Sequence, residues 1–140
     1  MAKVAYDAIA ERIGSSWTSV DGNALVVQDI NKDEQPSADG TAFIALEFPL
    51  TSERQFTIGD PGNNFFKQEC VFIIVINEER SKGTSRALGW ADELAALYRG
   101  KIFSNVQCFE VSGPAINDKN DLGNYFQIRL AVRYWFYVTG

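Results

Sequence analysis

The feature that most constrains the fold is an unbroken apolar run from Cys70 to Ile76. β-Branched side chains dominate this run, and its length is typical of a strand, so it predicts a strand over residues 67–77. Successive residues of a strand point to opposite faces of the sheet. A strand that is apolar on both faces must therefore be covered on both faces.

An amphipathic helix is predicted directly after this strand. Between Ala87 and Tyr98, apolar residues recur at steps of three and four, which places them on one helix face. Arg99 suits the negative end of a helix, and Gly100 can adopt the left-handed conformation that ends one. We expect this helix to cover one face of the strand. What covers the other face is the main question about function.

Shorter signals complete the predicted fold. Residues 4–13 predict a short N-terminal helix, and the alternation over 41–48 predicts a strand that Pro49 ends. Residues 102–111 predict a further strand, which Ser112-Gly113-Pro114 breaks. We therefore predict a single domain of 140 residues in the α+β class. Its mixed, mainly antiparallel β-sheet packs against one long amphipathic helix and a short N-terminal helix.

The last predicted strand, residues 124–138, has the most regular alternation in the chain. One of its faces is entirely apolar, and the other carries four candidate interface residues: Arg129, Arg133, Trp135 and Tyr137. Arginine and aromatic side chains are enriched at protein–protein interfaces. We predict that assembly buries this second face. The alternative is that the N-terminal helix covers it.

The strongest turn signal in the chain lies between Gly59 and Asn64. Its tip is polar, whereas apolar residues flank it closely, and this pattern favours a segment that is mobile in the free subunit and orders on a partner. The candidate interface residues here are Phe56, Ile58, Asp60, Asn63, Phe65 and Phe66. The alternative is a plain hairpin whose Phe residues fill the core of its own domain.

Composition argues against several functions. The chain has 13 Lys and Arg against 18 Asp and Glu, a net charge of −5, and no basic cluster, so binding to a nucleic-acid backbone is not expected. It has no histidine and no nucleophile elbow, phosphate loop or C-x-x-C pair. We expect a protein that is not an enzyme and needs no cofactor. Cys70 and Cys108 are expected to be buried free thiols in a reducing cytoplasm.

One segment imitates a metal site. Asp29-Ile30-Asn31-Lys32-Asp33 has the alternating oxygen ligands that open an EF-hand calcium loop. However, Glu34 occupies the position that needs Gly, and Gly40 occupies the position of the bidentate Glu. No metal site is therefore predicted. No segment has the composition of a signal region or a membrane span, so no membrane contact is expected.

Several weak signals follow one another in a characteristic order. The first are the short N-terminal helix and the segment from Val26 to Ile44, in which an Asn, a Pro and a Gly precede a strand that begins near an aromatic residue. The others are Arg54 to Gly59, strand 70–76, Gly83, Ala91-Asp92-Glu93-Leu94, Gly123, Tyr125 and Tyr134. This order resembles that of the tail terminator (tail completion) proteins of long-tailed bacteriophages. The chain departs from that family at Glu34, where relatives often carry an aromatic residue.

The resemblance implies an α+β subunit that assembles as a ring, usually a hexamer, on the last ring of the tail tube. Such a ring stops tube polymerisation and offers its opposite face to the head–neck connector, while DNA passes through the lumen without specific binding. The implied partners are further copies of the chain, the tail tube protein and the connector protein. The implied location is the phage tail in the virion, after assembly in the host cytoplasm. An acidic balance suits a channel that must not bind DNA.

Two alternatives stay open. The first is a small ligand-binding or enzymatic α+β barrel that dimerises through its sheet and closes a pocket between the sheet and the helix. The second is another head–tail joining or tail-tube protein of the same virion, since such folds also form rings from sheets.

Overall fold

The computed structural model describes residues 2–16, 26–28, 43–79, 85–117 and 125–140. In chain order, the elements are α1 (Ala2–Ser16), β1 (Val26–Gln28), β2 (Phe43–Gln55), β3 (Phe65–Glu79), α2 (Ser85–Tyr98), β4 (Ile102–Phe103), β5 (Val106–Asn117) and β6 (Tyr125–Thr139). The strands form a six-stranded sheet of order β1-β2-β3-β6-β5-β4. Only β1 and β2 pair in parallel, so the sheet is mixed and mainly antiparallel, as predicted.

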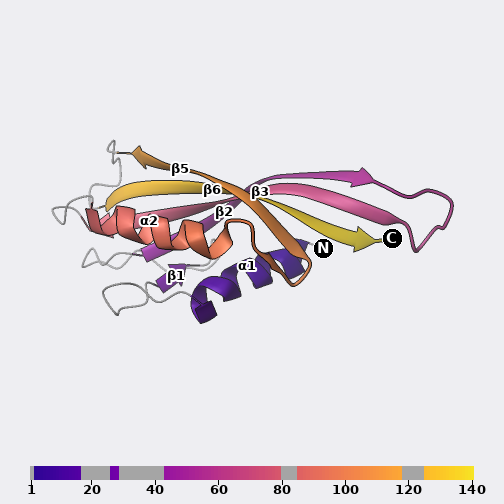
Figure 1. Cartoon of the computed structure of the whole chain (residues 1–140), viewed down its shortest axis with the longest axis horizontal. Helices are drawn as coiled ribbons and strands as arrows, with labels where there is room; N and C mark the ends of the chain where they lie inside the picture. Colours follow the sequence, from indigo (N-terminus) through magenta and orange to yellow (C-terminus); the bar gives the residue numbers. More distant parts are fainter. Residues whose placement is uncertain (1, 17–25, 29–42, 80–84, 118–124) are drawn as a thin grey trace.

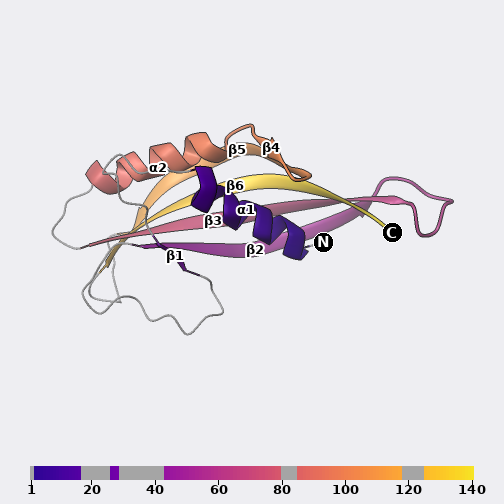
Figure 2. The same cartoon turned by 90° about the horizontal axis from the view of Figure 1, so that it is seen from below.

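One face of the sheet carries the core. The buried residues of β3 and β6 on this face have even numbers, from Cys70 to Ile76 and from Ile128 to Phe136, and they join one cluster with residues of both helices. Helix α1 contributes Ala5, Ile9 and Ile13 to this cluster. Figure 2 shows α2 lying along one side of the sheet. Burying a large apolar side chain stabilises the fold by about 1.5–3 kcal/mol, so this face accounts for most of the stability.

The two helices have nearly the same length. Helix α1 has 15 residues and α2 has 14, so the predicted contrast between one long helix and a short N-terminal helix is not confirmed. The predicted end of α2 is confirmed, because Gly100 follows it with a φ of 66°. In addition, the hydroxyl of Tyr98 donates a hydrogen bond of 2.6 Å to the carbonyl oxygen of Ile9, which ties the two helices together.

Two predicted strand ends are wrong. Strand β2 continues through Pro49, and β5 continues through Gly113-Pro114. In each strand the pairing register shifts around the proline, between Glu47 and Leu50 in β2 and between Ser112 and Ala115 in β5. A bulge leaves one residue out of the ladder, so a proline without an N–H is tolerated there.

The far ends of β2, β3 and β6 extend past both helices (Figure 1). We call this part the arm, and define it as residues 52–69 of the β2–β3 hairpin with residues 137–140 beside them. The register pairs Ser52 with Glu69 and Lys67 with Tyr137, so the arm begins as three paired strands. The end of the long final strand therefore projects beyond the body of the domain.

Candidate interaction surface

The face of the sheet opposite the helices is the candidate surface. We call it the open face, and define it by Glu47 of β2, Phe109 and Glu110 of β5, and the odd-numbered residues from Lys67 to Ile73 of β3 and from Arg129 to Tyr137 of β6. No helix of the described chain packs on it, because the core residues of α1 and α2 belong to the opposite face. The alternative that the N-terminal helix covers Trp135 and Tyr137 is therefore wrong.

Both predicted arginines of this face are paired within the chain. Arg129 Nη1 lies 3.0 Å from Glu47 Oε2, and this ion pair joins β6 to β2 across β3. Arg133 approaches Glu110 of β5 with two nitrogens, at 3.0 and 3.1 Å. A hydrogen bond from its own backbone N–H, followed by the one from Arg133, lowers the pKa of the Glu110 carboxyl. The charge of each arginine is thus already compensated, so neither is a free cation for an acidic partner.

Trp135 lies at the centre of a stack of cations and rings. The Nζ of Lys67 is 2.9 Å from the centroid of its indole ring, and the ring of Phe109 is 4.3 Å away, centroid to centroid, at a steep angle. Arg133 Cζ in turn lies 4.9 Å from the centroid of Phe109. Cation–aromatic contacts of this kind stabilise by about 0.5–2 kcal/mol each, depending on burial. The stack therefore holds the half-buried Trp135 in one position.

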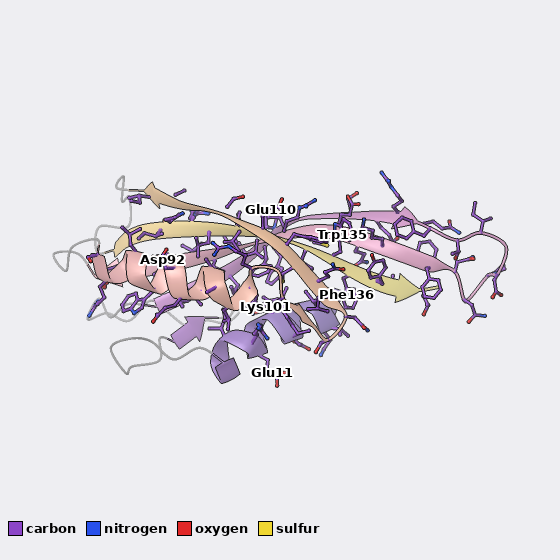
Figure 3. The ribbon with its side chains drawn as sticks, viewed as in Figure 1. Glu11, Asp92, Lys101, Glu110, Trp135 and Phe136 are labelled. Atoms are coloured by element: carbon purple, nitrogen blue, oxygen red, sulfur yellow. The ribbon has the colours of Figure 1, made fainter. Side chains whose placement is uncertain are left out.

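The stack continues from the body into the arm. Lys67 Nζ lies 5.4 Å from the centroid of Phe56, and the rings of Phe56 and Tyr137 are 6.4 Å apart. The side chain of Lys67 is only 8% exposed and also pairs with Glu69 at 3.2 Å. The open face and the arm thus form one continuous surface. Figure 3 shows Trp135 where the arm leaves the body.

The arm carries large apolar side chains that its own domain leaves in contact with solvent. Ile58 is 90% exposed, Phe65 51%, Phe56 50% and Tyr137 39%, whereas Phe66 is half-buried. Single exposed apolar residues are ordinary, but a group of them on one projecting segment is typical of an interaction site. The alternative that the Phe residues fill the home core is thus wrong for Phe56 and Phe65.

Hydrogen bonds within the chain hold the tip of the arm. The buried Asn64 exchanges two backbone hydrogen bonds of 2.9 Å with Gly140, and its side-chain Oδ1 accepts one from the backbone N–H of Asp60. The hydroxyl of Thr57 accepts another from the N–H of Phe65 at 2.8 Å. Asp60 and Asn63 themselves are exposed. These bonds do not support the predicted mobility of the tip in the free chain.

Sequence reasoning missed five residues that organise this surface: Glu47, Asn64, Lys67, Phe109 and Glu110. The sequence could have placed Lys67 on the open face, because Lys67 lies an even number of residues from Ile73 in the same strand and so shares its face. The partners on β2 and β5 depend on strand order and register, which the alternation within each strand does not reveal.

The two thiols lie away from this surface. Cys70 and Cys108 are buried and free, as predicted, and both are register partners of Tyr134, one on each side of β6. With β6 between them, their Cα atoms are separated by two strand spacings of about 4.8 Å each, too far for a disulfide. Burial raises the pKa of Cys108 to about 12, which removes the reactive thiolate at neutral pH.

Several predictions lie outside the described residues. They include the imitation of a calcium loop at 29–40 and, from the family resemblance, most of Val26 to Ile44, together with Gly83 and Gly123. In the described part of the chain, His, Cys, Asp and Glu side chains form no group of three or more that could hold a metal ion. Neither described helix is long and apolar enough to cross a membrane.

Comparison of the sequence with protein-family models and with curated proteins gives no match.

Proposed function

We propose that this chain is a structural virion protein of the tail terminator kind. In this proposal, copies of the chain form a ring, a hexamer as is usual in the family that it resembles, on the end of the tail tube. The ring ends tube polymerisation and presents its other face to the head–neck connector, and DNA passes through its lumen. The observation that carries the proposal is the continuous surface of open face and arm, which the described part of the subunit leaves without a helical cover.

The composition of this surface supports assembly with protein partners. Its rings, Phe56, Phe65, Trp135 and Tyr137, are the residue types that dominate interface energetics, and paired charges surround them. A polar rim around aromatic anchors is the usual anatomy of a protein interface. The net charge of −5 is compatible with a lumen through which DNA must slide.

The buried polar groups favour a structural role over an enzymatic one. Four polar residues are buried in the described part of the chain: Asn64, Lys67, Asn77 and Glu78. Each of these four has a partner within the chain, for example Gln127 for Asn77 at 3.0 Å and Arg86 for Glu78 at 2.6 and 2.9 Å. Only the buried indole N–H groups of Trp90 and Trp135 have no hydrogen-bond partner among the described residues. A catalytic pocket is instead expected to hold convergent polar groups that await a substrate.

The test is mass measurement of the purified protein by light scattering, with and without tail-tube protein. We expect a closed ring with a fixed number of copies, and we expect tail-tube protein to join it. Replacing Tyr137 or Trp135 by Ala removes an aromatic anchor and should shift the mass toward the monomer, since truncating such an anchor commonly costs about 2 kcal/mol or more. Val4→Ala, which truncates another exposed apolar residue on α1, is the matched control and should leave the ring unchanged.

Other outcomes identify the alternatives. A dimer that ignores tail-tube protein would favour the small ligand-binding or enzymatic barrel. A polymer of unlimited length would favour a tail-tube protein. Circular dichroism of each variant is the control for folding, because a Trp135→Ala variant that unfolds would place Trp135 in the core. The more exposed Tyr137 is the safer of the two substitutions.

A further inference from the structure

Most cations in the described part of the chain already have partners. Lys3, Lys67, Arg86, Arg129 and Arg133 form ion pairs, and Arg12 stacks on Phe103 and donates to the carbonyl oxygen of Leu97. Arg54, Arg99 and Lys101 are exposed and have no ion-pair partner among the described residues. Arg54 lies alone on β2 in the arm, whereas Arg99 and Lys101 lie close together, on either side of Gly100. A free positive charge is thus concentrated at the end of α2.

An exposed apolar residue follows these two cations. Ile102 is 72% exposed, more than any other large apolar residue of the described chain except Ile58. We call residues 99–102 the basic turn. Backbone hydrogen bonds fix its position, because the N–H of Gly100 donates to the carbonyl oxygen of Phe109 at 3.1 Å, and the carbonyl oxygen of Lys101 accepts from Cys108 at 2.9 Å. The basic turn is therefore a preformed surface.

The tip of the arm has the complementary composition. Ile58 is 90% exposed, and Asp60 follows it two residues later, also exposed. The hydrogen bonds of Asp60 involve its backbone atoms, and its carboxylate has no ion-pair partner in the described chain. At the tip, Ile58 and Asp60 therefore offer a strongly exposed apolar side chain and a negative charge, and the basic turn offers an exposed apolar side chain and two positive charges.

We propose that the tip of the arm of one copy docks on the basic turn of the next copy, with Ile58 against Ile102 and Asp60 against Arg99 and Lys101. This contact rests on the proposed ring and names its subunit interface. The tip and the basic turn of a single chain lie far apart, since the arm points away from the end of α2 and from Lys101 (Figures 1 and 3). The contact therefore requires a second copy.

The symmetry of such a contact agrees with a ring. It joins two different patches of the subunit, so it is head-to-tail, and a repeated head-to-tail contact either closes into a ring or continues as a filament. Opposite charges across an interface fix its register and disfavour wrong partners. The pair Asp60 and Lys101 would thus select which part of the neighbour the arm meets.

Charge reversal tests the ionic half of the contact. Asp60→Lys on the tip, and Arg99→Glu together with Lys101→Glu on the basic turn, should each weaken self-association by about tenfold or more, because each places like charges opposite one another. The variant that combines all three substitutions should recover most of the association, since it restores the attraction with all the signs exchanged. Asp92→Lys reverses an exposed acid on α2 and is the matched control, so it should leave association unchanged. Thermal unfolding of each variant checks that the fold is intact.

Disulfide trapping tests the apolar half of the contact. A mixture of an Ile58→Cys variant and an Ile102→Cys variant should give disulfide-linked dimers that contain one copy of each under mild oxidation. Either variant alone should give none, and the buried Cys70 and Cys108 should not interfere. An oligomer that tolerates both charge reversals and forms no mixed disulfide would contradict this contact and leave the ring intact. A chain that stays monomeric at all concentrations would contradict the ring and the contact together.

Discussion

At the scale of single residues, the buried thiol and phenols determine how the fold responds to alkali. Burial raises the pKa of Cys108 from 9.0 to about 12, and burial also raises the pKa values of Tyr98 and Tyr134 above their ordinary value. The unfolded chain therefore loses the Cys108 proton near pH 9, while the folded chain keeps it. The stability that this group contributes is complete below about pH 9 and is lost as the pH rises toward about 12.

We expect the melting temperature to change little between pH 7 and about pH 8.5 on this account, and to fall steeply above about pH 9. A series of thermal melts followed by circular dichroism measures this. Cys108→Ala should melt at a lower temperature at pH 7, because it leaves a cavity, but with a shallower decline above pH 9. A melting temperature that stays flat to pH 11 would show that the thiol ionises in the folded state.

The candidate residues show how far alternation within one strand can predict a site. It placed Arg129, Arg133, Trp135 and Tyr137 on one face correctly, because side chains of a strand alternate with a period of exactly two. It could not predict that Glu47 and Glu110 neutralise the two arginines. Those partners lie 82 and 23 residues away in the chain, on strands whose neighbours are decided by the sheet order.

At the scale of elements, Gly113 lies at one of the two register shifts of β5. Its φ is 111°, and a Cβ added there would lie 2.8 Å from the carbonyl oxygen of Arg129. Gly113→Ala is therefore strained and overpacked at once, and we expect it to destabilise the fold by about 1–3 kcal/mol. Gly89 in α2 is the matched control, since a Cβ there meets nothing within 4 Å, and Gly89→Ala should stabilise by about 0.5–1 kcal/mol.

Urea denaturation of both variants measures these changes. Equal stabilities of Gly113→Ala and the parent chain would mean that β5 does not bend at this position in solution. The same irregularity explains why the predicted end of this strand at Ser112-Gly113-Pro114 is wrong. Gly-Pro is a common turn signal, but here it lies inside a strand at a register shift, where the ladder does not need the missing N–H.

The arm is the second element with a testable property. The tip amides have partners within the subunit: Phe56 donates to Phe65, Asn63 to Asp60, Asn64 to Gly140 and Phe65 to Thr57. We therefore expect these four amides to exchange slowly with solvent already in the free subunit, slower than those of Gly59 and Gly62. Hydrogen exchange followed by NMR measures this. Uniformly fast exchange from Phe56 to Phe65 would restore the prediction of a mobile tip that orders only on a partner.

At the scale of the whole molecule, features that depend on residues close together in the sequence were predicted, and features that depend on distant residues were not. Helix α2, β3 and β6 followed from local periodicity and were found close to their predicted bounds. The sheet order and the parallel pairing of β1 with β2 depend on contacts between distant segments, which periodicity does not encode. The sequence predicted the arm only in part, because the turn signal marked the tip of the arm but not its length.

The length of the arm makes the subunit unusually extended, and this gives a prediction for its overall size. A compact domain of 140 residues has a radius of gyration of about 14 Å, which corresponds to a sphere about 37 Å across. Strand β3 alone has 15 residues and spans about 50 Å at about 3.3 Å per residue. Such a strand cannot fit inside the compact sphere, so the arm must project from it (Figure 2).

We therefore expect small-angle X-ray scattering of the monomer to give a radius of gyration above about 16 Å and a largest dimension beyond about 50 Å. The forward scattering, extrapolated to zero concentration, must correspond to one chain for the comparison to hold. A radius of gyration near 14 Å would mean that the arm folds back on the open face, where Phe56 and Tyr137 would cover Trp135 and leave no surface for a neighbour. An extended monomer instead exposes aromatic side chains far from the core. In the proposed ring, a neighbouring copy would bury these side chains.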